Sequence, residues 1–250
     1  MKRDLAYFLS DWNFDPTDIC ARKIIGLDGR EKLQVRLDLG VLQMEMVGRP
    51  DGDRPKGHAS MLDYYLDQLE DHRANGGRDE TFRLDADACG DLGQEGMLYY
   101  HRYICLLRLG EFDGVVRDTT HNLAILDMVQ AYADDEEDRI SFEQYRPYVL
   151  MIHTRAKGEI CLQNEDYQSA LQRIDEGMAK IRLCLDTYDE VDGEEELQAL
   201  STWAEEIDRE QPMSLLQQLT LELQSAIAEE QYEKAAKLRD QLQALDHRHS

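Results

Sequence analysis

LQQLTLELQSAIAEEQYEKAAKLRDQLQALD, residues 216–246, is the stretch that decides the fold expected for this chain. Apolar residues recur in it at intervals of three and four, the spacing that puts side chains on one face of an α-helix. Two such seams are present: Leu216, Leu219, Leu223 and Ala226, then Ala235, Leu238, Leu242 and Leu245. The polar residues Glu229–Gln231 separate them. The stretch therefore predicts two amphipathic helices folded into an antiparallel hairpin.

The same stretch resembles the UVR motif, whose pattern is a helix, an aromatic-Glu turn, a pair of alanines, Leu-Arg-Asp and a closing leucine. The matching positions are Tyr232, Glu233, Ala235, Ala236, Leu238, Arg239, Asp240 and Leu245. In families with this motif, such as UvrB and UvrC, Clp-type ATPases and activators of protein-arginine kinases, the hairpin binds another such hairpin or docks on a partner. The resemblance implies this interaction role only, because the chain has no GxxxxGK[ST] phosphate loop.

A hairpin of about thirty residues buries little apolar surface, so its remaining apolar edge invites a partner. Tyr232 is expected to plug the turn, and Ala235 and Ala236 to let the helices approach closely. Neighbouring charges would set register and partner choice. The predicted partner-binding residues are Leu219, Leu223, Tyr232, Glu233, Ala235, Ala236, Leu238, Arg239, Asp240 and Leu242. Two alternatives stay open: the helices cap the rest of the fold, or Arg239 and Asp240 form only a local ion pair worth under ~1 kcal/mol.

Upstream of the hairpin, residues 58–212 show helical spacing and predict a larger helical domain. Ser141 is expected to cap one long helix, with Pro147 near its first turn, where proline is tolerated. An acidic loop at residues 134–138 precedes it, and Pro212 ends the domain. The expected helices run from His58 to Asn75, Asp85 to Leu109, Phe112 to Tyr132, Ser141 to Leu162, Tyr167 to Leu185 and residue 197 to Arg209.

Residues 155–181, RAKGEICLQNEDYQSALQRIDEGMAKI, resemble a tetratricopeptide repeat. Small, medium and aromatic residues fall where such repeats let two helices pack closely, at Gly158, Cys161, Tyr167, Ala170 and Gly177. Residues 106–122 echo the pattern more weakly. The resemblance implies tetratricopeptide-like helical hairpins. An unrelated helical bundle is the alternative, because any antiparallel helix pair favours small residues at crossings.

The N-terminal residues 1–57 are expected to form a small β-ribbon. Its expected arms are Arg22–Leu27, Glu31–Leu39 and Val41–Val47, and apolar and polar residues alternate in the second arm from Leu33 to Leu39. Asp28-Gly29 suits a tight turn between the first two arms. A possible ligand surface comprises Gln34, Arg36, Asp38 and Arg49. These polar residues are otherwise the solvent face of an exposed sheet. The run from Tyr99 to Tyr103 is expected to alternate between core and surface of a helix, with a peptide or ligand groove as the alternative.

Charge argues against direct binding to nucleic acid. The formal net charge is −24, and residues 61–213 hold 36 acidic but only 14 basic side chains. Such a surface repels phosphate backbones, whose affinity for proteins comes largely from Lys and Arg. The five cysteines and seven histidines show no metal-ligand spacing, and no apolar run of about 20 residues could cross a membrane. No metal, cofactor or catalytic residue is therefore predicted, and a cytoplasmic location is expected.

The sequence thus predicts a mainly α fold of antiparallel helical hairpins in three regions, 1–57, 58–212 and 213–250. The predicted function is a non-enzymatic adaptor or regulator that binds a protein, and the candidate partners are another UVR hairpin and a second copy of this chain. One alternative is a ligand-binding protein or enzyme with a site on the N-terminal ribbon. Another, an accessory component of an excision-repair complex, rests on family analogy alone.

Overall fold

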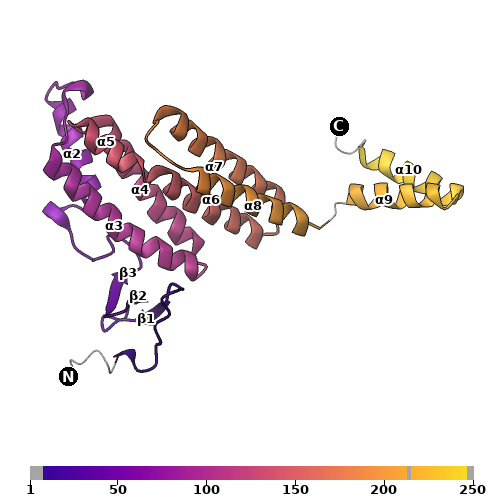
Figure 1. Cartoon of the computed structure of the whole chain (residues 1–250), viewed down its shortest axis with the longest axis horizontal. Helices are drawn as coiled ribbons and strands as arrows, with labels where there is room; N and C mark the ends of the chain where they lie inside the picture. Colours follow the sequence, from indigo (N-terminus) through magenta and orange to yellow (C-terminus); the bar gives the residue numbers. More distant parts are fainter. Residues whose placement is uncertain (1–7, 213–214, 247–250) are drawn as a thin grey trace. The chain divides into compact units, whose positions relative to one another are not determined.

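The computed structural model describes the backbone of residues 8–212 and 215–246, and the hairpin side chains of residues 218–241. The chain divides into two compact units, residues 1–205 and 206–250. The first unit is a small sheet with a set of helices, and the second contains a helical hairpin (Figure 1). Their elements confirm the predicted mainly α fold with an N-terminal sheet.

The sheet has three antiparallel strands in the order β1 (Ala21–Ile25), β2 (Glu31–Arg36) and β3 (Val41–Glu45). In the central strand Leu33 lies opposite Lys23 on one side and Met44 on the other. The predicted second arm was too long, since β2 ends at Arg36 and not at Leu39. Leu37 and Gly40 pair their backbones at 2.9 Å, which turns the chain into β3.

The sheet shares a core with helices of the first unit. Leu33, Val35 and Met44 pack with Tyr103 and Leu106 of α3 (Ala86–Arg108). Val115 of α4 (Phe112–Tyr132) and Ile152 of α6 (Arg146–Gln163) complete this cluster. A small ribbon needs a hydrophobic face or packing against a helix to be stable, and this sheet has such packing. The sheet is therefore part of the helical unit's core, as its marginal size requires.

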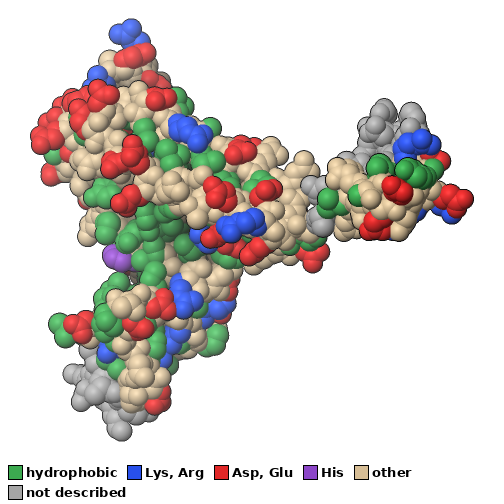
Figure 2. Space-filling view, turned by 45° about the vertical axis from the view of Figure 1, so that its right-hand side comes forward, with side chains coloured by type: hydrophobic (Ala, Val, Ile, Leu, Met, Phe, Trp, Pro, Cys, Tyr) green, Lys and Arg blue, Asp and Glu red, His purple; other side chains and the backbone are tan. Residues whose placement is uncertain are grey.

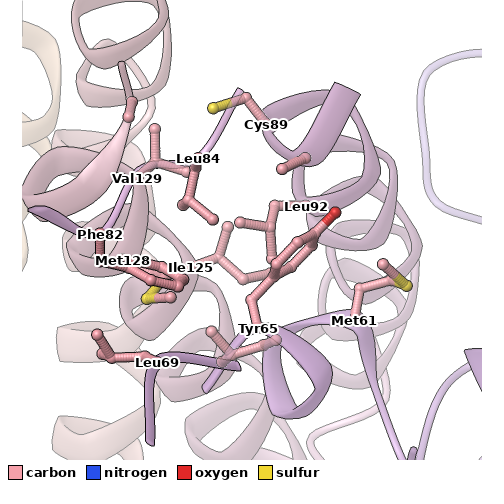
Figure 3. Packing of buried hydrophobic residues seen from close by; sticks show 13 residues of the cluster. Met61, Tyr65, Leu69, Phe82, Leu84, Cys89, Leu92, Ile125, Met128 and Val129 are labelled. Atoms are coloured by element: carbon pink, nitrogen blue, oxygen red, sulfur yellow. The ribbon is translucent and has the colours of Figure 1, made fainter. Parts of the chain in front are cut away.

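A second core lies where α2 (Met61–Ala74) covers α3 and α4. Tyr65, Leu92 and Ile125 point into the same space from these three helices (Figure 3). Ser60 accepts a hydrogen bond from the Asp63 amide at 2.9 Å and so caps α2. For this reason α2 begins at Met61 and not at His58, as the sequence had suggested.

The predicted long helix from Ser141 was wrong. Two helices occupy this region: α5 (Glu136–Glu143), capped by Asp135, and α6, which begins at Arg146 with Pro147 in its first turn. Ser141 lies inside α5, where its hydroxyl donates to the Asp138 carbonyl at 2.8 Å. Residues 136–138, predicted as an acidic loop, instead form the first turn of α5, where negative charge favours the helix dipole.

Small residues mark the closest helix contacts. A side chain at Gly177 of α7 (Tyr167–Thr187) would clash with Thr154 of α6, and one at Gly158 would clash with Trp203 of α8 (Glu194–Glu210). Two of the positions that suggested a tetratricopeptide repeat, Gly158 and Gly177, therefore serve close packing of α6, α7 and α8. The repeat itself stays a prediction.

Figure 2 shows a band of hydrophobic side chains on one face of the first unit, with carboxylates spread around it. None of the helices in the described ranges is both long enough and apolar enough to span a membrane.

Candidate protein-interaction site

The predicted interaction site is the hairpin of α9 (Leu215–Ala228) and α10 (Tyr232–Asp246). Its polar turn lies at Glu229–Gln231, as the sequence indicated. Glu230 adopts a positive φ of 57°, and the Gln231 amide donates to the Ala226 carbonyl at 2.8 Å. This bond satisfies one of the last carbonyls of α9, and the positive φ at Glu230 lets the chain reverse its direction.

The hairpin has a small core of its own. Ala226, Ala235 and Leu238 are buried, and Leu219 and Leu223 pack against them, partly exposed. All five are seam positions of the sequence pattern. Alanine at two of the three buried positions leaves little side-chain volume between the helices, which permits their close approach. The side chain of Leu242, also predicted for the site, lies outside the described residues.

Two of the structural roles predicted for this hairpin were wrong. Tyr232 is 69% exposed and does not plug the turn. Ala236 is exposed as well, so only Ala235 of the alanine pair lies between the helices. For the alanine pair the physical reason is helix geometry, because consecutive residues point about 100° apart and only one of the two can face the partner helix. Tyr232 is the first residue of α10, beside the polar turn, where its ring stays in solvent. Tyr232 and Ala236 instead belong to the accessible surface.

The accessible surface of the hairpin is mixed. Leu221 and Ile227 are half-exposed in addition to Tyr232. Glu233 is exposed, and Arg239 contacts its neighbour Asp240 at 3.0 Å, with both side chains more than 60% exposed. An ion pair in water at this exposure adds little stability. These side chains are free to meet a partner, and the geometry also agrees with the local ion pair considered above.

The N-terminal ligand surface is not assembled as one site. Arg36 hydrogen-bonds the carbonyls of Leu37, Asp38 and Gly40 and so holds its own turn. Gln34 donates to Gln43 at 2.9 Å, while Asp38 is exposed.

Arg49 points elsewhere, with Nε 3.0 Å from the Glu95 carboxylate of α3. The two arginines therefore serve different structural contacts: a turn of the sheet and the helical core.

Glu95 is the centre of a buried polar cluster that the sequence analysis missed. Its carboxylate accepts hydrogen bonds from the Met61 and Leu62 amides at 2.7 and 3.1 Å, and lies 3.0 Å from both Arg49 and His121. Burial raises its pKa, but the bonds from His121 and the two amides outweigh this, so the pKa lies below the ordinary value. With three hydrogen bonds to its oxygens and the Arg49 charge close by, this carboxylate is a structural clamp.

A buried ion pair lies about two helical turns further along α3. Arg102 and Asp118 are fully buried, joined by two hydrogen bonds of 2.6 and 2.7 Å, and Arg102 also donates to the Glu45 carbonyl at 2.9 Å. Such a bidentate pair ties α3, α4 and the end of β3 together. Exposed Arg117 contacts Asp118 as well, at 2.8 Å.

The sequence does contain a signal for these residues. Glu95 and Arg102 interrupt an apolar stripe with the helical spacing Leu92, Glu95, Tyr99, Arg102 and Leu106. A charge on the buried stripe of a helix requires a partner, because an unpaired buried charge is costly. Asp118 interrupts the facing stripe of α4 in the same way, between Val115 and Ile125.

In the described part of the chain, no group of His, Cys, Asp and Glu side chains is arranged to hold a metal ion.

Comparison with known proteins bears on the hairpin alone. No curated protein and no solved structure matches the chain. One family model does match, over residues 214–248, and its description is the UvrB/uvrC motif. The C-terminal hairpin of this chain therefore carries a UVR motif.

Proposed function

We propose that the chain is a non-enzymatic adaptor or regulator that binds a partner protein through its C-terminal hairpin. The observation that carries the proposal is the contrast inside the hairpin between a core of three buried side chains and a surface that exposes Leu221, Ile227 and Tyr232. An interface that covers these side chains would stabilise a hairpin too small to do so itself.

The partner we infer is another helical hairpin with a UVR motif, on a second protein or a second copy of this chain. Ile227 and Tyr232 flank the turn on either side, next to the exposed Glu233 and Lys234. Tyrosine beside an apolar residue is a frequent centre of binding energy in interfaces. The flanking charges would select the partner and its register. DNA is not the inferred partner, since the hairpin has a net negative charge.

Capture from native lysate by the full chain tests the proposal. The variant Ile227→Ser with Tyr232→Ser removes apolar surface without touching the buried seam, and Gln218→Ser with Gln224→Ser is the matched control on exposed polar positions. The full chain and the control should retain a protein that the apolar variant and a chain ending at Pro212 both lose. Equal capture by all four chains would refute the hairpin as the binding surface.

Light scattering of the purified chain over a concentration series tests whether the partner is a second copy of this chain. If the partner is a second copy, the mass should rise with concentration for the full chain and for the glutamine control. The Ile227→Ser, Tyr232→Ser variant should stay monomeric. A constant monomer mass for all chains assigns the partner to a different protein.

A further inference from the structure

A cavity of about 620 Å³ lies among α3, α4, α5 and the start of α6 in the first unit. Sites for small molecules commonly have volumes of 300–1,000 Å³ and apolar walls with few polar groups. This cavity fits that description, since none of its described lining residues is charged. Met97 and Tyr145 line it and are at least half-exposed, so the cavity opens to solvent.

Glycine creates the free space on the α3 side. Gly93 and Gly96 line the cavity one helical turn apart. A Cβ at Gly96 would meet nothing closer than the Asn122 Oδ1 atom, at 4.0 Å, whereas one at Gly93 would press on Phe142 at 3.2 Å. The open volume therefore adjoins Gly96, and Asn122 Oδ1 borders it.

Asn122 supplies a buried acceptor without a partner. The residue is only 8% exposed, and its Nδ2 donates to the Gly96 carbonyl at 3.0 Å. That bond fixes the orientation of the amide, because exchanging its oxygen and nitrogen would bring two acceptors together. No described protein group hydrogen-bonds Oδ1. A buried acceptor left unpaired is unfavourable, and a ligand donor would remove that penalty.

Aromatic rings form much of the wall. Tyr100 and Tyr148 lie with their ring centroids 6.2 Å apart, Tyr103 meets Tyr100 edge to face at 5.5 Å, and Phe142 and Tyr145 complete the set. Such rings bind a flat aromatic ligand by stacking and edge contacts. A charged ligand would lose its hydration without an opposite charge in the lining.

We propose that this cavity binds a neutral aromatic molecule carrying one N–H or O–H donor, which bonds Asn122 Oδ1. The ligand class follows from three features together: the aromatic walls, the uncharged lining and the buried Asn122 acceptor that no described protein group bonds. The site lies wholly within the first unit and is independent of the function proposed for the hairpin.

Indole and benzofuran form a matched pair of probes for the full chain. Both are flat two-ring molecules of the same shape, but only indole has an N–H donor. Binding is followed by ligand-observed proton NMR. Indole should bind roughly three- to tenfold more tightly than benzofuran, the range of one net hydrogen bond of about 0.5–1.5 kcal/mol. Equal affinities, or no indole binding, would overturn the proposal without any mutation.

A pair of glycine variants on α3 locates the site. Gly96→Leu fills the space beside Asn122, while Gly90→Leu adds the same side chain on the exposed face, where nothing lies within 4 Å. Both replace a helical glycine by a better helix former, so both should remain folded by circular dichroism. Indole affinity should fall at least roughly tenfold for Gly96→Leu and stay unchanged for Gly90→Leu. Unchanged affinity in folded Gly96→Leu would place indole elsewhere and refute the site.

Discussion

The helical unit and the C-terminal hairpin are both built from antiparallel helices, but they bury different groups. The helical unit has two apolar cores, and it also buries the Arg102–Asp118 pair and the Glu95 carboxylate, whose ionic partners are Arg49 and His121. The hairpin buries two alanines and a leucine and leaves its own Arg–Asp pair in water. Antiparallel helices therefore bury large apolar cores in the helical unit, but in the hairpin they bury only three small or medium side chains and leave other apolar side chains exposed.

The two Arg–Asp pairs offer the largest test of this comparison. Asp118→Ala leaves Arg102 charged, unpaired and fully buried, so the free energy of unfolding should fall by about 3–5 kcal/mol. Asp240→Ala, the matched change in the hairpin, should cost under about 1 kcal/mol because that pair is exposed. Urea unfolding followed by circular dichroism measures both. Similar losses for the two variants would contradict the assigned difference between the pairs.

Acid should weaken the helical unit through His153. Burial, with the charges of Lys157 and Lys180, lowers its pKa from 6.5 to about 4, and its Nδ1 contacts the Thr119 hydroxyl at 2.8 Å. In the unfolded chain His153 therefore takes up a proton below about pH 6.5, while in the folded chain its imidazole stays neutral until about pH 4. Stability is full above pH 6.5 and should fall as the pH drops toward 4, by about 3 kcal/mol at most.

His153→Gln is the control for this acid sensitivity, because glutamine keeps a polar partner for Thr119 but cannot titrate. Urea midpoints of both chains at pH 7 and pH 5 give the comparison. The variant should lose less stability between these two pH values than the parent. Identical losses would exclude His153 as their source.

The hairpin seam gives a smaller and more local effect. Ala235→Arg forces a long charged side chain between α9 and α10, costing about 1–3 kcal/mol by overpacking, whereas Ala236→Arg places the same group in water. Amide hydrogen exchange over residues 215–246 should accelerate in the first variant only. Amides of α3 and α4 should be unaffected in both. Equal exchange in the two variants would show that Ala235 does not hold the helices together.

Local pattern predicted most of the fold. The Asp28-Gly29 turn, the three strands, the ends of α4 and the beginning of α7 follow from residues close in sequence. The break between α5 and α6 was missed because the sequence offers two N-cap residues, Asp135 and Ser141, only six residues apart. Choosing Ser141 as the cap merged the two helices into one. Both candidates have the right chemistry, and sequence alone gave no reason to prefer Asp135.

The site was predicted less completely, for reasons of packing. Helical spacing identifies Leu223, Ala235 and Leu238 as seam residues, but it does not say which of two adjacent alanines faces the other helix. The buried Glu95 clamp joins Arg49 and His121, which are far apart in sequence. Periodicity can mark such a charge as unusual on its stripe, but only the tertiary fold supplies its partners.

Removal of the hairpin should produce the smallest effect of all on the helical unit. A chain ending at Pro212 retains every strand and all of α2 to α8, including the two cores and both buried ionic clusters. Since these contacts supply the stability of that unit, its cooperative thermal transition should persist with an almost unchanged midpoint. Circular dichroism at a helical wavelength measures the midpoint against that of the full chain. A lost or strongly lowered transition would show that the hairpin caps the helical unit, the alternative that the sequence left open. An unchanged midpoint, together with loss of captured partner, would assign stability to the first unit and recognition to the second.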